Sequence, residues 1–262
     1  MAREMRKDML RMALKAGASG AHLGGALSLA EILSVLFSGV LRFDPQDPKQ
    51  ENRDRLILSK GHGAVALYAA MHQAGLASDA DIDSFKACNH WMTAHPVLDI
   101  NHRLEFTSGS LGQGLSFAAG CALRLKNKPC RLFVILGDGE CNEGQVWEAA
   151  MFAAHHALNN ITVIVDANTL QYDGKTQDIL DMGRLEDKWA AFGWAASVVD
   201  GHDVAALHAC LSEGTFKATS LPRAIIAQTV KGKGISFMEN NAQWHHGRIS
   251  QKHFDKAMAE LG

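Results

Sequence analysis

Apolar runs alternate along the chain with segments of helical spacing. The runs at 132–136 and 161–165 are largely apolar without strict alternation, as expected for strands whose two faces are both buried. Shorter runs at 56–58, 195–199 and 224–229 predict further strands. Strands that alternate with helices indicate an α/β fold, in which a parallel sheet is flanked by helices on both faces.

Helices account for most of the remaining pattern. Apolar positions at helical spacing predict helices at 3–16, 64–74, 78–86, 142–158, 204–211 and 250–260, and an Ala-rich helix from 110–114 through 125. Ser28 is predicted to cap a further helix that continues to about Phe37, since a serine hydroxyl accepts a hydrogen bond from the first helical turn. The segments 42–55, 88–107, 172–187 and 231–247 lack clear periodicity and are predicted as loops.

Composition narrows the class of protein. The chain has 262 residues, 47% of them hydrophobic, with no internal repeat or linker, and we expect residues 1–262 to form one domain. Acidic and basic residues are interspersed and the net charge is −2, which favours neither nucleic acid nor a membrane surface as partner. The five cysteines form no Cys-x-x-Cys pair, and we find neither a signal peptide nor a run of ~20 apolar residues. We therefore expect reduced thiols and a cytoplasmic location.

Two polar side chains stand at the ends of consecutive predicted strands. Asp138 lies in a Gly-Asp-Gly turn after the run at 132–136, and Asn168 follows the run at 161–165. The carboxyl ends of parallel strands meet at one edge of a sheet, where ligands bind. Carboxylate, amide and carbonyl oxygens suit a Mg²⁺ ion that also binds phosphate oxygens. A Gly-Asp-Gly turn alone is common, but together with Asn168 it predicts a site for Mg²⁺ and a diphosphate.

Four motifs, taken in order, resemble the transketolase family of thiamine diphosphate enzymes. The segment 137–174 resembles the family's fingerprint of Gly-Asp-Gly, helix and strand ending in Asn, and residues 59–63 resemble its Gly-His-Gly segment. Residues 109–114 resemble its Gly-Pro-Leu-Gly-Gln-Gly loop, with Ser110 in place of proline, and residues 19–24 resemble the segment of its first histidine. The resemblance extends along nearly the whole chain.

The resemblance implies roles for individual residues of this sequence. Three ligands of Mg²⁺, for which Ca²⁺ or Mn²⁺ can substitute, are implied: Asp138, Asn168 and the Leu170 carbonyl. Contacts to thiamine diphosphate are implied for His62, Gly109, Ser110, Leu111, Gly139 and Asn168. Catalytic roles facing the sugar are implied for His22, His95 and His246. Glu143 matches an acidic residue that the family uses at a subunit interface.

Two parts of this assignment have ordinary alternatives. His245 and His246 offer two candidates for one family position, and His246 is favoured because it adjoins Gly247. Lys231 and Lys233 are candidates for phosphate contact, although their Lys-Gly-Lys-Gly run is more typical of a solvated loop.

The resemblance covers the diphosphate-binding domain alone. The family's pyrimidine-binding domain, which supplies a glutamate to the aminopyrimidine ring and basic residues for the sugar phosphate, has no counterpart here. We therefore expect the N-terminal subunit of a split transketolase, paired with a separate pyrimidine-domain chain in an α₂β₂ assembly. Such an enzyme transfers a two-carbon ketol unit from a ketose phosphate to an aldose phosphate through thiamine diphosphate. The alternative is a fragment of a longer enzyme.

Three other functions stay open at this point. They are a subunit like deoxyxylulose phosphate synthase, one like the α chain of a 2-oxo acid dehydrogenase, and a non-catalytic module that binds thiamine diphosphate. The Gly-His-Gly and Leu-Gly-Gln-Gly motifs favour transketolase over the first, and the His22 segment favours it over the second. The histidines argue against the third. A pentose phosphate, a sulfonated sugar and a branched-chain sugar phosphate would all fit as substrate.

Overall fold

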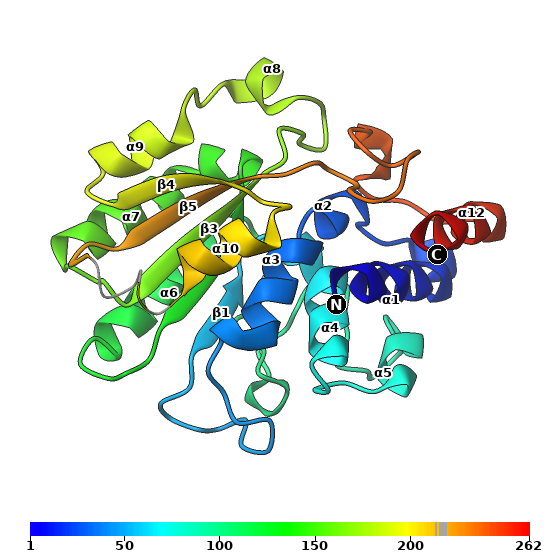
Figure 1. Cartoon of the computed structure of the whole chain (residues 1–262), viewed down its shortest axis with the longest axis horizontal. Helices are drawn as coiled ribbons and strands as arrows, with labels where there is room; N and C mark the ends of the chain where they lie inside the picture. The colour runs from blue at the N-terminus through cyan, green and yellow to red at the C-terminus, as the bar shows by residue number, and fades with distance from the viewer. Residues whose placement is uncertain (213, 215–218) are drawn as a thin grey trace.

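The structure is a computed structural model, and it describes residues 1–212, 214 and 219–262. Within these residues a five-stranded, all-parallel sheet has the order β1-β2-β3-β5-β4 (Figure 1). The strands are β1 (Arg55–Leu58), β2 (Leu132–Gly137), β3 (Ile161–Ala167), β4 (Ala195–Asp200) and β5 (Arg223–Gln228). The predicted strands and their parallel arrangement are confirmed, with shifts only at the strand ends.

Helices cover both faces of the sheet (Figure 1). Before β2 they are α1 (Ala2–Lys15), α2 (Gly24–Leu27), α3 (Ala30–Val35), α4 (Ala64–Gln73), α5 (Asp79–Asp83) and α6 (Gln113–Arg124). After β2 they are α7 (Gly144–His155), α8 (Thr176–Leu180), α9 (Leu185–Ala191), α10 (Val204–Leu211) and α12 (Gln251–Leu261). Short 3₁₀ turns occur at Gly17–Ser19, Gly61–Gly63, Ile100–His102, Gly139–Asn142 and Ala242–Trp244, and a π-helical turn at Leu36–Val40.

The central strands divide the hydrophobic core in two. On β2, Phe133 and Ile135 join the cluster that contains α1, α3, α4 and α10. The alternate residues Leu132, Val134 and Leu136 join the cluster that contains α6, α7 and α9. Because neighbouring strand residues point to opposite faces, a strand covered on both sides needs apolar residues at every position. This burial explains the continuous apolar run in the sequence.

Helix boundaries differ from the sequence-based expectation. Ser28 does not cap a helix: α3 has Leu29 at its N-cap, and the buried Ser28 hydroxyl donates to Asp166 Oδ2 at 2.7 Å. The helix predicted at 142–158 is α7, which a separate 3₁₀ turn precedes, and the loop predicted at 172–187 contains α8 and the start of α9. Apolar periodicity locates the body of a helix better than its ends.

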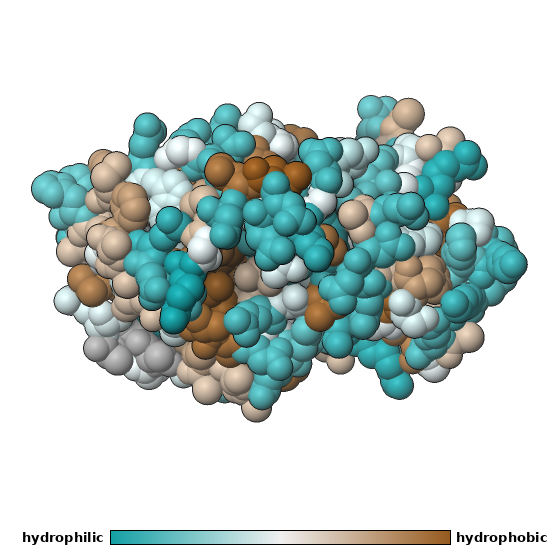
Figure 2. Space-filling view, turned by 90° about the horizontal axis from the view of Figure 1, so that it is seen from above, coloured by the Kyte–Doolittle hydropathy of each residue, from teal (hydrophilic) through white to brown (hydrophobic). Residues whose placement is uncertain are grey.

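Hydrophilic side chains cover much of the surface, with hydrophobic ones gathered in patches between them (Figure 2). Large hydrophobic side chains that remain exposed include Val97, Leu98, Leu111, Met151 and Tyr172. Over the described part of the chain, no helix has the length and apolar character that crossing a bilayer requires.

Candidate functional site

Asp138 and Asn168 meet at the carboxyl ends of β2 and β3. The two strands pair in register as far as Gly137 and Asp166, so the residues that follow each strand emerge at the same edge of the sheet. Both side chains are buried, and the Asp138 carboxylate accepts the Thr169 N–H at 2.6 Å. Burial and the nearby Asp166 raise the pKa of Asp138. The structure thus brings the two predicted residues together in a polar, enclosed setting.

Asp166, the second-last residue of β3, connects the chain segments that surround Asn168. Its fully buried carboxylate accepts hydrogen bonds from the side chains of Lys60, Ser28, Asn168 and Thr229. The Asn168 Nδ2 donates to Asp166 at 3.0 Å, which orients the amide and leaves Oδ1 on the opposite side. Although burial opposes it, the Lys60 ammonium lowers the pKa of Asp166, so the carboxylate stays ionised.

A cavity of about 190 Å³ opens at this edge of the sheet. Its lining includes Lys60, His62, Asp138, Gly139, Asn168, Leu170, Lys231 and His245. The turn after β2 is close-packed: a Cβ at Gly139 would lie 2.7 Å from Gln171 Cγ. The Gly139 N–H donates to Asp138 Oδ1 at 2.8 Å. The cavity lining therefore includes three residues whose oxygen atoms can bind a metal ion: Asp138, Asn168 and Leu170. The backbone at Gly139 packs directly against the Gln171 side chain.

The expectation of a solvated loop at Lys231 is wrong. Lys231 follows β5 and is 1% exposed. Its Nζ donates to the carbonyl oxygens of Leu170 at 2.7 Å and Gln171 at 3.2 Å, and lies 2.9 Å from His245 Nδ1. Burial, together with the nearby Lys60, lowers the pKa of Lys231 to about 8. A buried cation thus faces the same cavity as Asp138.

Five histidines gather beside this cavity, from segments far apart in the sequence. The His22 ring lies 4.4 Å from His246, 5.6 Å from His95, and 5.7 Å from both His62 and His245, between centroids. His62 and His245 are 5.1 Å apart. The predicted histidines are therefore neighbours. His245, which sequence reasoning set aside, lines the cavity, whereas His246 is exposed beside His22.

Burial lowers the pKa of four of these histidines. It lowers the pKa of His22 to about 3, with a further contribution from His246, and that of His245 to about 4, with a further contribution from Lys231. Burial and Lys60 lower the pKa of His62 well below its ordinary value, and burial and Lys86 lower that of His95. A neutral imidazole has one N–H donor and one acceptor nitrogen. The cluster can therefore both give and accept hydrogen bonds near neutral pH.

Glu140 joins the loops on the other side of the cavity. Its buried carboxylate accepts the Ser59 hydroxyl and the N–H groups of Gly112 and Gly137, the last two at 2.9 and 3.0 Å. Burial raises the pKa of Glu140. The hydrogen bonds tie the turn after β2 to the turn after β1 and to the loop that precedes α6.

The remaining predicted residues are exposed. Gly109 and Ser110 are exposed, and Leu111, 37% exposed, lines the cavity from the rim. Glu143 is exposed at the N-cap of α7, where its Cβ would lie 2.8 Å from a Cβ at Gly112. Contacts of these residues with a cofactor or another chain remain predictions.

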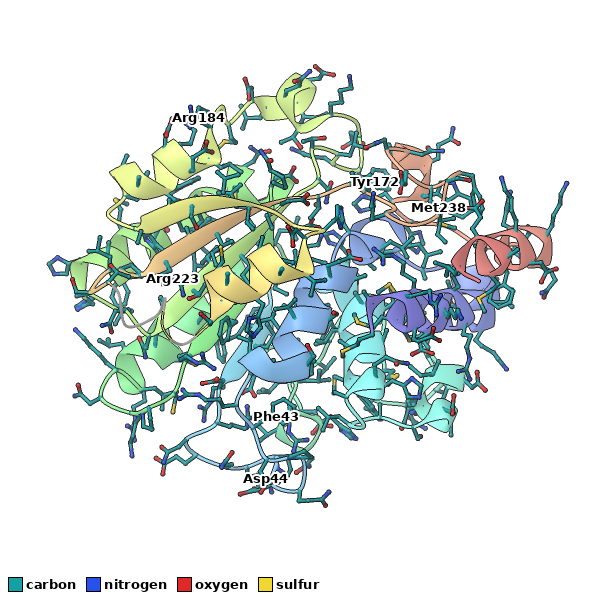
Figure 3. The ribbon with its side chains drawn as sticks, viewed as in Figure 1. Phe43, Asp44, Tyr172, Arg184, Arg223 and Met238 are labelled. Atoms are coloured by element: carbon teal, nitrogen blue, oxygen red, sulfur yellow. The ribbon has the colours of Figure 1, made fainter. Side chains whose placement is uncertain are left out.

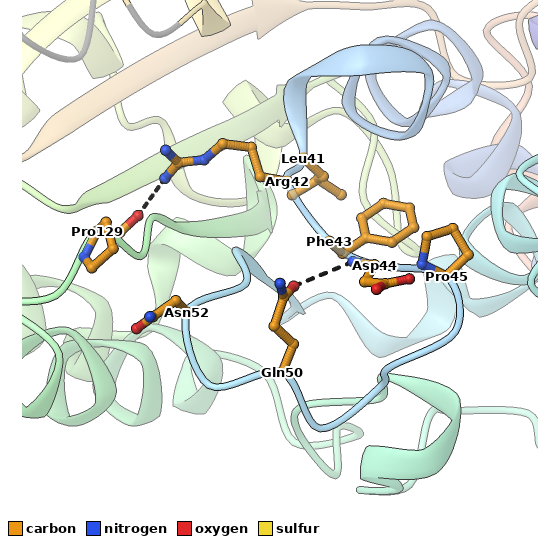
Figure 4. Close-up of a pocket in the computed structure, with 8 residues that line it drawn as sticks. All are labelled: Leu41, Arg42, Phe43, Asp44, Pro45, Gln50, Asn52 and Pro129. Carbon is orange, nitrogen blue, oxygen red and sulfur yellow. Dashed lines mark hydrogen bonds between the residues drawn. The ribbon is translucent and has the colours of Figure 1, made fainter.

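A second, larger cavity of about 570 Å³ lies away from this site. It is lined by residues of the segment 41–52 and by Pro129, with Arg42 bonded to the Pro129 carbonyl and the Asp44 N–H bonded to Gln50 (Figure 4). Phe43 and Asp44 lie at the opposite side of the molecule from Tyr172, which marks the predicted site (Figure 3). This larger cavity contains none of the predicted site residues.

A comparison of the whole chain with known protein families gives a match over almost its full length. The family described as "Transketolase, thiamine diphosphate binding domain" matches residues 5–262. This chain belongs to the transketolase family. Its fold and its thiamine diphosphate-binding domain are therefore confirmed.

Relatives of this transketolase-family chain differ in length. It is 39% identical over 242 residues to the 6-deoxy-6-sulfo-D-fructose transketolase subunit SqwG of Clostridium sp. (strain MSTE9), covering 92% of this chain and 88% of the relative. It is 33% identical over 258 residues to an apulose-4-phosphate transketolase subunit of Phocaeicola vulgatus, covering 98% and 90%. The structure of Campylobacter jejuni transketolase matches with a TM-score of 0.90 at 29% identity, covering 100% of this chain and 42% of that one.

Four further polar residues build the site. Lys60, Glu140 and Asp166 were not singled out from the sequence, and Lys231 was named as a candidate for phosphate contact, although a solvated loop was favoured. Each stands within three residues of the carboxyl end of a strand, at β1, β2, β3 and β5. That position at the ligand-binding edge of a parallel sheet was the available signal.

Proposed function

We propose that this chain is the diphosphate-binding subunit of a split transketolase, which transfers a two-carbon ketol unit from a ketose phosphate to an aldose phosphate. The observation that carries the proposal is a difference in coverage. The chain spans 88% and 90% of relatives named as transketolase subunits, but 42% of the C. jejuni transketolase chain. We propose that, as in relatives of this length, a second chain supplies the rest of the active site.

The cavity suits Mg²⁺ and the diphosphate of the cofactor. Asp138, the Asn168 amide oxygen and the Leu170 carbonyl would bind Mg²⁺, and Ca²⁺ or Mn²⁺ could replace it. Three oxygen donors of this kind are the ligands that hard cations prefer, and they leave coordination positions for phosphate oxygens. The Lys231 ammonium and the backbone at Gly139 would lie against the diphosphate. The close packing at Gly139 and the buried cation at Lys231 support this fit.

Thiamine diphosphate, when bound, supplies the electron sink for breaking the carbon–carbon bond next to the ketose carbonyl. The chain itself contributes hydrogen bonds and proton transfer. His22, His95 and His246 would face the sugar, where imidazole groups can donate to a developing alkoxide or accept a hydroxyl proton. His62 and the rim residues Gly109, Ser110 and Leu111 would enclose the cofactor rings.

The partner would be a separate chain with a pyrimidine-binding domain, in an α₂β₂ assembly. Leu111 is 37% and Tyr172 66% exposed beside the cavity, and the second chain would cover them and enclose the ring end of the cofactor. Exposed hydrophobic residues that cluster near a site indicate a surface for association. Glu143, exposed near the same rim, would lie in that interface.

The test is native mass spectrometry of the protein isolated from its own source with Mg²⁺ and thiamine diphosphate, followed by assays of ketol transfer. We expect a stoichiometric second chain, bound cofactor, and transfer by the pair but not by this chain alone. Equal turnover by the isolated chain would contradict the split. A cofactor-bearing homodimer without transfer would instead support a binding module or a fragment.

Substrate assays with the assembled pair identify the sugar. The two relatives are named for 6-deoxy-6-sulfo-D-fructose and for apulose-4-phosphate. A panel of donors should therefore contain a sulfonated sugar, a branched-chain sugar phosphate and a pentose phosphate. The donor with the highest kcat/KM defines the substrate class.

A further inference from the structure

The position of Lys231 depends on the segment 230–234, which crosses the molecule after β5. Two backbone hydrogen bonds hold its centre: the Gly232 N–H donates to the Gly24 carbonyl and the Asn240 N–H to the Lys231 carbonyl, both at 2.9 Å. Gly232 and Gly234 have φ values of +80° and +92°, a conformation that glycine adopts readily. Side chains contact the two ends of the segment, among them Glu239, whose carboxylate accepts the Gly234 N–H at 2.9 Å.

His202 holds the first end. The Val230 N–H donates to His202 Nε2 at 2.8 Å, so that nitrogen carries a lone pair. The proton of the neutral ring is then on Nδ1, which donates to Glu31 Oε2 at 2.9 Å. The imidazole therefore connects α3 to the residue that precedes Lys231.

Arg6 holds the second end. Its Nε donates to the Lys233 carbonyl at 2.8 Å, and its two terminal nitrogens donate to the two Glu31 oxygens at 2.7 and 2.9 Å. A Cβ at Gly234 would lie 2.7 Å from Arg6 Nε, so the segment packs directly on the guanidinium. Although burial opposes it, the bonds from His202 and Arg6 lower the pKa of Glu31 to about 2.

The Glu31 carboxylate thus binds both Arg6 and His202, the two side chains that hold the segment on either side of Lys231. Bidentate arginine–carboxylate pairs fix geometry as well as charge. The Arg6 and Glu31 side chains are 8% and 12% exposed, which limits their motion. The ammonium that this segment carries lies 2.7 Å from the Leu170 carbonyl.

We propose that Arg6, Glu31 and His202 are positioning residues: they form a clamp that holds the segment 230–234 and presents the Lys231 ammonium to the diphosphate of the cofactor. This clamp rests on the proposed function, because it acts on the affinity of this chain for thiamine diphosphate. None of its three side chains lines the cavity.

The test is a double-mutant cycle with thiamine diphosphate as the probe. Calorimetry at saturating Mg²⁺ measures the affinity for thiamine diphosphate of the wild type, His202→Ala, Lys231→Met and the double variant. Each protein is purified together with any partner chain that binds it. We expect His202→Ala to weaken binding roughly tenfold when Lys231 is present and not at all when it is methionine, since supporting residues act through the group they hold.

Two control variants separate positioning from packing. His202→Gln supplies one N–H donor and one carbonyl acceptor, and should retain near wild-type affinity. His208→Ala, exposed on α10, should change nothing. The clamp would be overturned if His202→Ala weakened binding equally with Lys231 and with methionine at position 231. It would also be overturned if His202→Ala did not weaken binding in either case. If the wild-type protein shows no Mg²⁺-dependent binding of thiamine diphosphate, the proposed function itself is refuted.

Discussion

Lys60 and Asp166 form a buried ion pair beneath the predicted site, with Nζ and Oδ2 2.5 Å apart. Their side chains are 1% and 0% exposed. A buried ion pair need not stabilise a fold relative to apolar residues, but removal of one partner leaves an uncompensated charge. The pair therefore makes the fold sensitive to single substitutions at the site.

Lys60→Met should lower the free energy of unfolding by about 3–5 kcal/mol, because Asp166 would remain buried without its cation. Urea titration of the cofactor-free protein measures this change. Lys252→Met, at an exposed position on α12, is the matched control and should have little effect. The double variant Lys60→Met with Asp166→Asn should recover part of the loss. A double variant as unstable as the single one would contradict this account.

His95→Ala should separate catalysis from cofactor binding. The His95 ring lies 5.6 Å from His22 but does not line the cavity. Turnover of the assembled enzyme should fall by about a hundredfold, the usual scale for loss of a proton-transfer group. The affinity for thiamine diphosphate, measured by calorimetry, should stay nearly unchanged. In the control His155→Ala, at an exposed position, both turnover and affinity should stay unchanged. A matching loss of cofactor affinity would contradict the assigned role.

At the scale of elements, the turn between β2 and α7 sets how closely backbone approaches the cavity. Gly139→Ala should weaken thiamine diphosphate binding roughly tenfold, since the new Cβ would displace Gln171 and its bond to Asn142. Gly144→Ala is the control, because nothing lies within 4 Å of its Cβ position. Calorimetry with Mg²⁺ compares them. Similar affinities in the two variants would show that the close approach at Gly139 is unimportant.

The sequence predicted elements well where burial alone determines them. The strands are apolar because both faces are covered, and this pattern is local. Ser28 and Lys231 were misassigned because their partners are distant: Asp166 lies 138 residues from Ser28, and Leu170 lies 61 residues from Lys231. Local patterns do not contain such pairs. The ends of the two predicted strands located Asp138 and Asn168, but not the groups that hold them.

At the scale of the whole molecule, the proposed site combines a buried interior with an exposed edge. Lys60, Asp138 and Lys231 are buried where they line the cavity, whereas Tyr172 and the residues Gly109, Ser110 and Leu111 are exposed. Glu143 stands near that exposed edge at the start of α7, in contact range of a Cβ at Gly112. An exposed carboxylate beside an incomplete site is suited to pair with a donor on a second chain.

Glu143→Gln should weaken assembly with the partner roughly tenfold, because a charged hydrogen bond at the interface would lose its ionised acceptor. Sedimentation analysis or native mass spectrometry over a range of concentrations measures the dissociation constant. Glu51→Gln is the control: Glu51 is exposed and pairs with Lys128, away from the rim. The isolated Glu143→Gln chain should unfold at the same urea concentration as the wild type. Unchanged assembly, or an equal loss in Glu51→Gln, would place the interface elsewhere on the molecule.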